Sequence, residues 1–301
     1  MPLVLHPPRP AHVALRRRFA VLRVVFAVFL LVMAGAAASA YPANSRLQQI
    51  ASTKSIKIGY RSDSKPFSFL NEQQEPAGYT IELCKLIVKA LERELKVPLA
   101  IAWVPVTTHD RFTAVASGKA DMECGSSTVT LGRMKVVDFS NYIFVENTAL
   151  AVTAESGIHT LADLGGRKIA VITGTSNEAA LARALERRRV GATIVHVANR
   201  HEGLAALESG KVDAFASDRY LLDGMKSDTA LSILPEDLST EPYAVVLPQG
   251  DWAFRLAVNT ALAQIFRSSD IINIFTKWVG GGVQRPNQLI GAIYLLGALS
   301  D

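Results

Sequence analysis

The sequence of 301 residues has only two cysteines, Cys84 and Cys124, too few for the disulfide framework that holds small secreted domains together. Both lie in apolar segments, so we expect buried free thiols, with a single pairing between them in an oxidising compartment as the alternative. The patterns HExxH, CxxC, GxSxG and the P-loop are also missing, which removes familiar signatures of hydrolytic, redox and nucleotide chemistry. We expect neither a metal nor a cofactor.

The first forty residues contain no acidic side chain and carry five arginines. An apolar run, VVFAVFLLVMAGAAA, follows these arginines, and Ala38-Ser39-Ala40 precedes Tyr41. Basic residues, an apolar run and a small-x-small site are the parts of a secretory signal peptide. The run is short for a membrane span, so we predict that residues 1–40 are a cleaved signal peptide, with an uncleaved anchor as the alternative.

The rest of the chain has no excess of either charge. The whole sequence has 32 Lys and Arg residues and 27 Asp and Glu residues, and removing the five arginines of residues 1–40 leaves 27 of each sign. No block of like charge remains beyond the short run Arg187-Arg188-Arg189. A neutral chain lacks the basic footprint of a nucleic-acid-binding protein, so we expect no nucleic-acid partner.

Two segments of the sequence match each other without gaps. Residues 114–127 read AVASGKADMECGSS, and residues 206–219 read ALESGKVDAFASDR. Each contains a helix end, a Ser-Gly-Lys-x-Asp turn and a short apolar strand. In this register Ser126 and Asp218 are equivalent, because each lies just past the carboxyl end of its strand.

Predicted strands and helices alternate along most of the chain. The expected strands are residues 56–60, 99–104, 120–124, 168–172, 194–198 and 212–216, and the expected helices are residues 79–95, 110–117 and a third ending at residue 189. Alternating βαβ units imply covered parallel sheets, and about 260 mature residues exceed one typical core. We therefore expect two α/β lobes, with a ligand beyond the carboxyl ends of their strands.

Polar side chains gather at these strand ends. Guanidinium groups bind carboxylates in bidentate geometry, so three arginines and one aspartate suit a ligand with two carboxylates and one ammonium. Each residue alone has a structural explanation; Thr175 and Glu178, for example, form a capping box. Only the whole set predicts a site, and its members are Arg61, Thr108, Arg111, Ser126, Thr128, Arg133, Thr175, His201 and Asp218.

Four stretches, GYRSDSKPFSF, GYTIELCKLIVKAL, ECGSSTVTLGRMKVVDFSNYIF and LADLGGRKIAVITGTSNEAAL, resemble family 3 of the periplasmic solute-binding proteins, which serve polar amino-acid ABC transporters. The resemblance covers residues 56–278. More narrowly, VTTHDR followed by ECGSST is similar to the glutamate/aspartate-binding branch. The resemblance implies a type II periplasmic-binding-protein-like fold, an α/β architecture of two domains joined by two crossover strands.

The resemblance also implies a role for each residue at a matching position. The α-carboxylate of the ligand would be bound by Arg133, Thr128 and Thr175, and its ammonium by Asp218 with Ser126. The second carboxylate would be bound by Arg61, Thr108, Arg111 and Ser126. The branch also uses a histidine in its second lobe. Here Arg200 stands at that place and His201 follows one residue later, so which of the two faces the ligand stays open.

The same resemblance implies a division of the chain and a way of working. We expect residues 41–150 plus 245–301 to form lobe one and residues 151–244 to form lobe two, with hinge strands near 148–153 and 243–247. The ligand would favour the closed form by bridging both lobes. The closed protein, a periplasmic monomer, would then deliver an acidic amino acid to a permease in the inner membrane.

Two further expectations complete the interpretation. The apolar C-terminal run at residues 289–299 is too short to span a membrane and predicts a docked helix. The strongest alternative function is an enzyme on the same fold, such as a periplasmic cyclohexadienyl dehydratase acting on prephenate or arogenate. That reaction needs a general acid or base, and Asp218 and His201 are the candidates.

Overall fold

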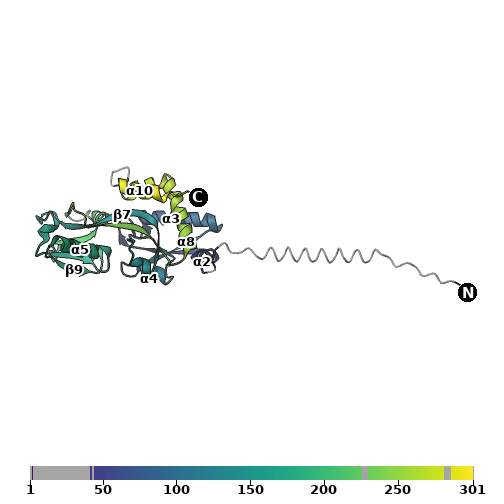
Figure 1. Ribbon diagram of the computed structural model, residues 1–301, viewed down its shortest axis with the longest axis horizontal. Coiled ribbons are helices and arrows are strands. Elements are labelled where there is room, and N and C mark those ends of the chain that lie inside the picture. The colour runs from purple at the N-terminus through teal and green to yellow at the C-terminus, as the bar shows by residue number, and fades with distance from the viewer. Residues whose placement is uncertain (1, 3–40, 43, 226–229, 281–285, 301) are drawn as a thin grey trace. The chain divides into compact units, whose positions relative to one another are not determined.

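The first strand of the sheet has apolar side chains at alternate positions, and those of Ile56 and Ile58 are completely buried. The computed structural model describes residues 2, 41–42, 44–225, 230–280 and 286–300 (Figure 1). The predicted signal peptide, apart from residue 2, lies outside the described residues. The strands are β1 (Ser55–Tyr60), β2 (Asp63–Ser64), β3 (Ser68–Leu70), β4 (Pro76–Ala77), β5 (Ala100–Pro105), β6 (Met122–Glu123), β7 (Asp138–Thr153), β8 (Lys168–Ile172), β9 (Thr193–Val197), β10 (Ala214–Asp218), β11 (Leu231–Ile233) and β12 (Ser239–Leu247).

The three helices expected at residues 79–95, at residues 110–117 and up to residue 189 have nearly these bounds in the structure. The long amphipathic helix expected at residues 79–95 has these bounds in the structure. Thr175 caps the helix that begins at Ser176, as the capping pattern of the sequence indicates. The helices are α2 (Arg46–Thr53), α3 (Tyr79–Leu95), α4 (Arg111–Ala116), η1 (Arg133–Lys135), η2 (Leu161–Leu164), α5 (Ser176–Arg188), α6 (Arg200–Glu208), α7 (Arg219–Asp223), α8 (Trp252–Arg267), α9 (Asp270–Trp278) and α10 (Gln288–Gly297).

One sheet runs through the unit formed by residues 44–301, in the order β5-β1-β6-β12-β7-β10-β8-β9, with β11 pairing with β7. The strands β5, β1 and β6 are parallel, as are β10, β8 and β9. Between these sets lie β7 and β12, which pair antiparallel with each other. Figure 1 shows α5 and β9 at one end of this unit and α2, α3 and α8 at the other. The structure confirms the predicted fold of two α/β lobes joined by two crossover strands.

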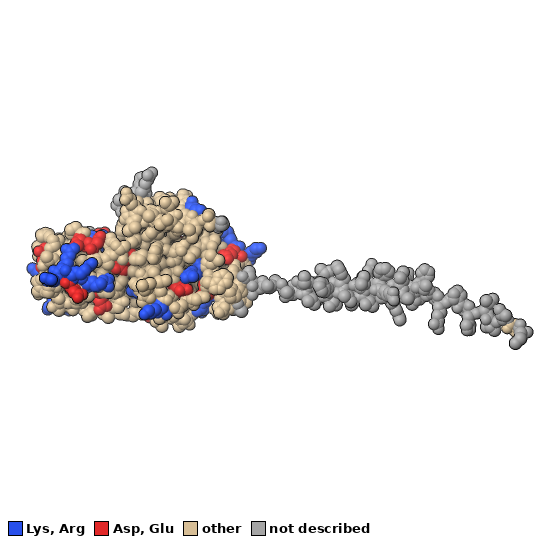
Figure 2. Space-filling model, viewed as in Figure 1, with Lys and Arg blue, Asp and Glu red and all other residues tan. Residues whose placement is uncertain are grey.

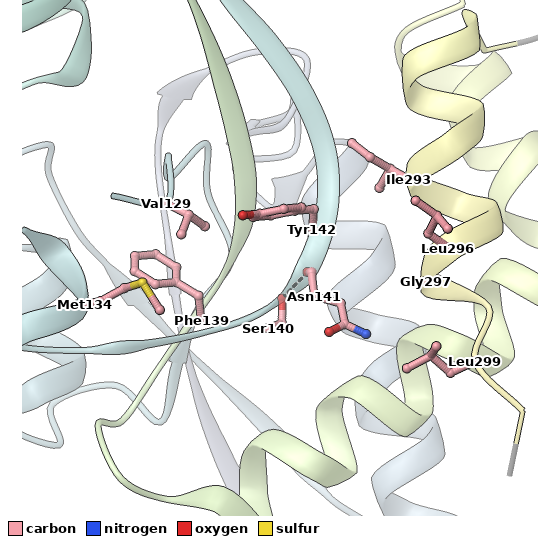
Figure 3. A pocket seen from close by; sticks show the side chains of 10 residues that line it. All are labelled: Val129, Met134, Phe139, Ser140, Asn141, Tyr142, Ile293, Leu296, Gly297 and Leu299. Atoms are coloured by element: carbon pink, nitrogen blue, oxygen red, sulfur yellow. Dashed lines mark hydrogen bonds between the residues drawn. The ribbon is translucent and has the colours of Figure 1, made fainter. Parts of the chain in front are cut away.

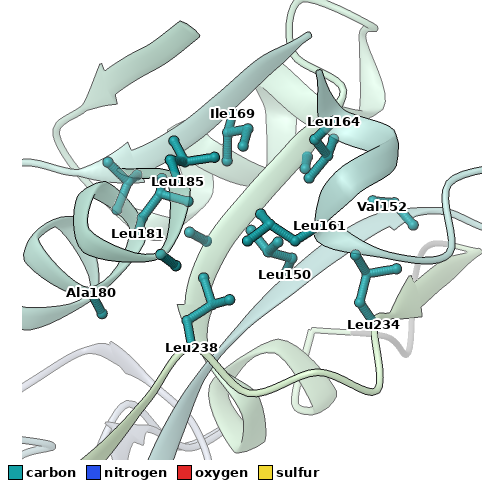
Figure 4. Close-up of a cluster of buried hydrophobic side chains, with 14 of the residues drawn as sticks. Leu150, Val152, Leu161, Leu164, Ile169, Ala180, Leu181, Leu185, Leu234 and Leu238 are labelled. Atoms are coloured by element: carbon teal, nitrogen blue, oxygen red, sulfur yellow. The ribbon is translucent and has the colours of Figure 1, made fainter. Parts of the chain in front are cut away.

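The lobe built on β8, β9 and β10 is covered on both faces, as parallel sheets require. On one face Leu150, Ile169 and Leu181 belong to a cluster that packs β7 and β8 against α5 (Figure 4). On the other face Phe215 and Leu222 belong to a second cluster. We call this half lobe two and the half built on β5, β1 and β6 lobe one. Lobe two therefore has a hydrophobic core of its own, and truncating one such buried leucine to alanine costs about 2–5 kcal/mol.

The two cysteines are joined in a disulfide, and the expectation of free thiols is wrong. Cys84 lies in the middle of α3, and Cys124 directly follows β6. Their Cα atoms are 6.5 Å apart, within the range that a disulfide spans. The sequence could not decide between the two alternatives, because the 40 residues that separate the cysteines give no hint that α3 packs beside β6.

The C-terminal apolar run forms α10, which docks as predicted. The Tyr294 hydroxyl of α10 lies 2.8 Å from the Tyr79 hydroxyl of α3, which itself donates to the carbonyl of Ile143 at 2.7 Å. Within the described part of the chain, no helix has the length and apolar character needed to cross a bilayer. Figure 2 shows charges of both signs over α5 and β9 and an almost uncharged surface over α10.

Candidate functional site

Three arginines of the predicted set lie where strands of lobe one end. Arg61 directly follows β1, Arg111 begins α4 after β5, and Arg133 begins η1 after β6. The Arg61 and Arg111 side chains are deeply buried, since the residues are only 3% and 4% exposed, respectively. Burying several cations together is unfavourable unless anions face them, and the protein itself places the Asp63 and Glu123 carboxylates near these two arginines.

The glycine in the ECGSS stretch makes room for Arg61. A Cβ atom on Gly125 would lie 3.0 Å from the Cγ of Arg61 and would collide with the Glu123 carboxylate. The Arg61 side chain donates from Nη2 to Asp63 at 2.6 Å, while its buried Nε has no hydrogen-bond partner among the described residues. Burial lowers the pKa of Arg61, and the neighbouring Arg200 lowers it further.

The second and third arginines flank one aromatic ring. The guanidinium carbon of Arg111 lies 4.4 Å from the ring centre of Phe112, and that of Arg133 lies 4.8 Å from the same centre. Arg111 also donates to the carbonyl of Thr108, while its buried Nε is unpartnered within the described structure. Burial, with repulsion from Arg133 and Arg61, lowers the pKa of Arg111 to about 9. An anion bound here would relieve both effects.

The hydroxyl residues of the predicted set line the same region. Arg133 donates from Nη1 to the carbonyl of Thr128 at 2.7 Å, which joins η1 to the segment that follows β6. The hydroxyls of Thr108 and Ser126 are buried and have no partner among the described residues. Unpaired buried hydroxyls are costly, and two of them beside buried arginines mark a place where a polar ligand would complete the hydrogen bonding.

Asp218 is the acidic residue of lobe two at this position, and it ends β10. Its Oδ1 accepts from the Asn177 amide at 3.1 Å, and the same amide donates to the Thr148 hydroxyl of β7 at 2.9 Å. Thr175, which precedes Asn177, caps α5 and is half-buried. Burial raises the pKa of Asp218, although the nearby Arg200 acts in the opposite direction. A buried carboxylate of this kind gains most from a ligand cation.

The two lobes touch each other at this site. The Ser176 hydroxyl of α5 donates to the Thr128 hydroxyl of lobe one at 3.1 Å. Arg200 of α6 donates from Nη1 to Ser64 of β2 at 3.1 Å and lies 3.4 Å from Asp63. Each of these contacts joins a residue of lobe two to a residue of lobe one, so the lobes are closed on each other in this structure.

The structure shows which of the neighbouring residues Arg200 and His201 is buried with the other polar groups of the site, a choice that the sequence left open. His201 is exposed on α6 and lies outside the group of buried polar side chains. Arg200, the first residue of α6, is 5% exposed and lies 3.8 Å from Asp218. The physical reason is the helix period of about 100° per residue, which turns consecutive side chains to different faces.

Several acidic and amide groups at the site were missed by the sequence interpretation. They are Asp63, Glu123, Asn177 and Glu241. Glu123 carried a signal, since a charged residue in a short apolar strand calls for a buried partner. Its Oε2 accepts from Ser127 at 2.9 Å, and burial raises its pKa against the attraction of Arg111. Asn177 and Glu241 carried no such signal, because only the fold brings them near Asp218.

The combined site has one clear chemical capacity. Four guanidiniums surround it, with the Nε atoms of Arg61, Arg111 and Arg200 buried and unpartnered within the described structure. Asp218 supplies a carboxylate for a cation. Among the described residues, no group of three or more His, Cys, Asp or Glu side chains has the arrangement needed to hold a metal ion. The geometry suits a small ligand with two anionic groups and one cationic group.

An apolar groove lies on lobe one. It is a groove of about 420 Å³ between β7 and α10, and Figure 3 shows the side chains that line it, among them Phe139, Tyr142, Ile293 and Leu296. The lining contains no charged residue and none of the predicted ligand residues. The groove therefore does not belong to the charged site.

Comparisons with known proteins agree with this geometry. Residues 56–281 match the bacterial extracellular solute-binding proteins, family 3. The chain is 32% identical over 250 residues to a glutamate/aspartate import solute-binding protein of Salmonella typhimurium, covering 81% of this chain and 83% of that protein. It is 33% identical over 241 residues to an L-glutamate/L-aspartate-binding protein of Pseudomonas aeruginosa, covering 77% and 79%.

A solved structure of similar fold adds a second line of comparison. It is an ancestral amino acid-binding protein described as a precursor of cyclohexadienyl dehydratase, with a TM-score of 0.67 and 26% sequence identity. The similarity covers 78% of this chain and 99% of the other. The fold of the present chain is thus shared with proteins that bind amino acids.

Proposed function

The chain belongs to family 3 of the bacterial extracellular solute-binding proteins, and on this premise we propose that it binds glutamate or aspartate between its lobes and delivers it to an amino-acid ABC transporter. The names of its relatives from Salmonella and Pseudomonas support this ligand class. The partner would be the permease of such a transporter in the inner membrane, and we expect the delivering form to be a periplasmic monomer released from its signal peptide.

One observation carries the proposal: buried donor atoms from several elements have no hydrogen-bond partner among the described residues, and Asp218 lies 3.8 Å from the guanidinium of one of them, Arg200. The unpartnered donor atoms are the Nε atoms of Arg61, Arg111 and Arg200 and the hydroxyls of Thr108 and Ser126. An acidic amino acid has the matching groups, because two carboxylates can accept from the donors while the ammonium donates to Asp218. A neutral amino acid would leave buried charge unpaired, at a cost of roughly 3–5 kcal/mol.

We assign the groups of the ligand to residues as follows. Arg133, with Thr128 and Thr175, would hold the α-carboxylate, and Asp218 with Ser126 would take the ammonium. The second carboxylate would be bound by Arg61, Thr108 and Arg111 from lobe one and, in place of His201, by Arg200 from lobe two. The support for Arg200 is its burial and its distance of 3.8 Å from Asp218.

We further propose that the lobes move as units during binding. Lobe one would comprise residues 41–150 and 245–301, and lobe two residues 151–244. The supporting observation is that β7 and β12 are long strands that pair with each other between the two parallel sets. Small changes of backbone angle in two such strands open and close the lobes while each core stays packed.

A thermal-shift screen of ligand-free protein against the common amino acids and small dicarboxylates tests this function. Glutamate and aspartate should each raise the melting temperature in a concentration-dependent way, and glutamine and asparagine should not. Equal shifts with the acids and their amides would contradict a site for two carboxylates.

A second candidate is the periplasmic dehydratase on the same fold. The structural similarity to a precursor of cyclohexadienyl dehydratase favours it, and the candidate general acid is Asp218, whose pKa is raised by burial. A protonated carboxyl can act as a general acid. Incubation with prephenate or arogenate separates the two functions, because a binding protein returns its ligand unchanged and a dehydratase yields an aromatic product.

A further inference from the structure

The helix α6 packs tightly against strand β10 of the same lobe, and this packing fixes the position of Arg200. A Cβ atom on Gly203 would lie 2.5 Å from the ring of Phe215 in β10, so only glycine allows the helix to approach so closely. The Asn199 side chain caps the same helix by accepting from the backbone N–H of Glu202 at 2.9 Å. Arg200 therefore leaves a rigid helix end and points toward the other lobe.

The group that Arg200 meets there is the short strand β2. Arg200 Nη1 lies 3.4 Å from Asp63 Oδ2 and donates to Ser64 at 3.1 Å. The next residue along, Lys65, also touches lobe two, since a Cβ atom on Gly224 would lie 2.8 Å from the Lys65 carbonyl oxygen. The β2 segment thus contacts lobe two at two separate points.

Asp63 is the centre of this contact because it binds a guanidinium from each lobe. Its Oδ1 accepts from Arg61 at 2.6 Å, and its Oδ2 faces Arg200. Burial alone would raise the pKa of Asp63, but Arg200 and Arg61 outweigh it and hold the pKa below the usual value. Asp63 therefore stays ionised at neutral pH and supplies the negative charge that two facing arginines require.

We propose that Asp63 is a positioning residue that bridges the lobes: it holds Arg61 and Arg200 in their binding positions and favours the closed form before any ligand arrives. The inference rests on the proposed function and deepens it. The apparent affinity for a ligand is the intrinsic affinity multiplied by the fraction of protein that is in the binding-competent form. A protein whose closed form is already populated without ligand therefore binds its ligand more tightly. The bridge should strengthen the binding of every ligand that needs closure by one common factor.

The variant Asp63→Asn tests the bridge, because asparagine keeps the size of the side chain and removes its charge. The matched control is Asp213→Asn, which removes an exposed ion pair with Arg167, at 3.0 Å, that lies wholly within lobe two. Small-angle X-ray scattering of ligand-free protein should give a larger radius of gyration for Asp63→Asn than for the wild type and the control. Saturating glutamate should return all three to the same value.

Calorimetry supplies the second measurement. We expect Asp63→Asn to weaken glutamate and aspartate by the same factor, about tenfold if the closed population falls tenfold, and the control to bind like the wild type. In the double variant Asp63→Asn/Arg200→Met, the loss should be smaller than the product of the two single losses, since both changes break one contact.

Three results would overturn the inference. The first is an unchanged radius of gyration and affinity in Asp63→Asn, and the second is independent losses in the double variant. The third is a tenfold change in the ratio of glutamate to aspartate affinity, because Asp63 would then discriminate between the two ligands instead of holding the lobes together. If the wild type bound no acidic amino acid, the proposed function would fail, while the scattering of the ligand-free proteins would still test the bridge.

Discussion

At the scale of single residues, the proposed site gives different arginines different parts of the ligand to bind. In the proposed site Arg133 meets the carboxylate that every amino acid has, and Arg111 meets the one that only acidic amino acids have. Arg111 is buried, stacked on Phe112 and repelled by the other guanidiniums. In the proposed site, the energy released when an anion reaches Arg111 would therefore be the main source of selectivity.

Replacing these two arginines should produce different losses. We expect Arg133→Ala to abolish binding of all amino acids, and Arg111→Ala to weaken glutamate and aspartate by about two to four decades with little effect on any residual binding of glutamine. Isothermal titration calorimetry measures each affinity. Intact glutamate and aspartate binding in Arg111→Ala would show that this side chain does not face the ligand.

Gly125 offers a second test at this scale, with a control on the same segment. Gly125→Ala places a Cβ atom against the Glu123 carboxylate and 3.0 Å from Arg61 Cγ, whereas a Cβ atom on Gly132 meets only the Thr130 hydroxyl, at 3.9 Å. We expect Gly125→Ala to weaken glutamate binding at least tenfold, about 1.4 kcal/mol, and Gly132→Ala to leave it unchanged. Equal affinities in the two variants would refute the close packing assigned to Gly125.

At the scale of secondary-structure elements, the disulfide joins α3 to the site. Cys124 stands directly before Gly125, so the Cys84–Cys124 bond anchors the segment that carries Ser126 and Thr128. The bond closes a loop with a sequence separation of 40 residues. A loop of this length restricts the unfolded chain enough to stabilise the fold by about 2–4 kcal/mol.

Removing this bond should lower stability measurably. In urea, the double variant Cys84→Ser/Cys124→Ser should unfold at a lower midpoint than the wild type, and a reducing agent should lower the wild-type midpoint while leaving the variant unaffected. Identical midpoints for the oxidised wild type and the variant would contradict a stabilising role for the disulfide.

The elements also show how far the sequence alone could predict this protein. Periodicity and capping located α3, β8 and the start of α5, because these signals depend on neighbouring residues. The end of β10 was placed two residues early, and β6 is shorter than expected, since strand ends depend on pairing partners. Residues that meet only through tertiary contacts, such as Asp63 with Arg200 and Cys84 with Cys124, could not be paired from the sequence.

At the scale of the whole molecule, buried carboxyl groups make the ligand-free protein sensitive to pH. Burial raises the pKa values of Glu123, Glu146 and Asp218 in the folded state. The folded state therefore takes up these protons at a higher pH than the unfolded chain, whose values lie near about 4. The free energy of unfolding should therefore fall as the pH rises from about 4 through the raised pKa values of these groups. Groups with lowered pKa values, such as Asp63, act in the opposite direction and reduce the free energy of unfolding only below about pH 4.

We accordingly expect ligand-free protein to melt at a higher temperature at pH 5 than at pH 7. Saturating glutamate should reduce the difference, because an ammonium beside Asp218 favours the ionised carboxylate. Differential scanning calorimetry at fixed ionic strength provides both values. A melting temperature of the ligand-free protein that increases from pH 5 to pH 7 would contradict this account of the buried carboxyls.

The most direct test of the central claim is a calorimetric titration of folded protein, freed of any co-purified ligand by unfolding and refolding, with glutamate, aspartate, glutamine and asparagine. The account predicts saturable heat with at least one acidic amino acid and an affinity lower by two or more decades, about 3 kcal/mol, for its amide. The absence of heat with both acids, or equal affinity for an acid and its amide, would contradict a closed site that buries two carboxylates among guanidiniums.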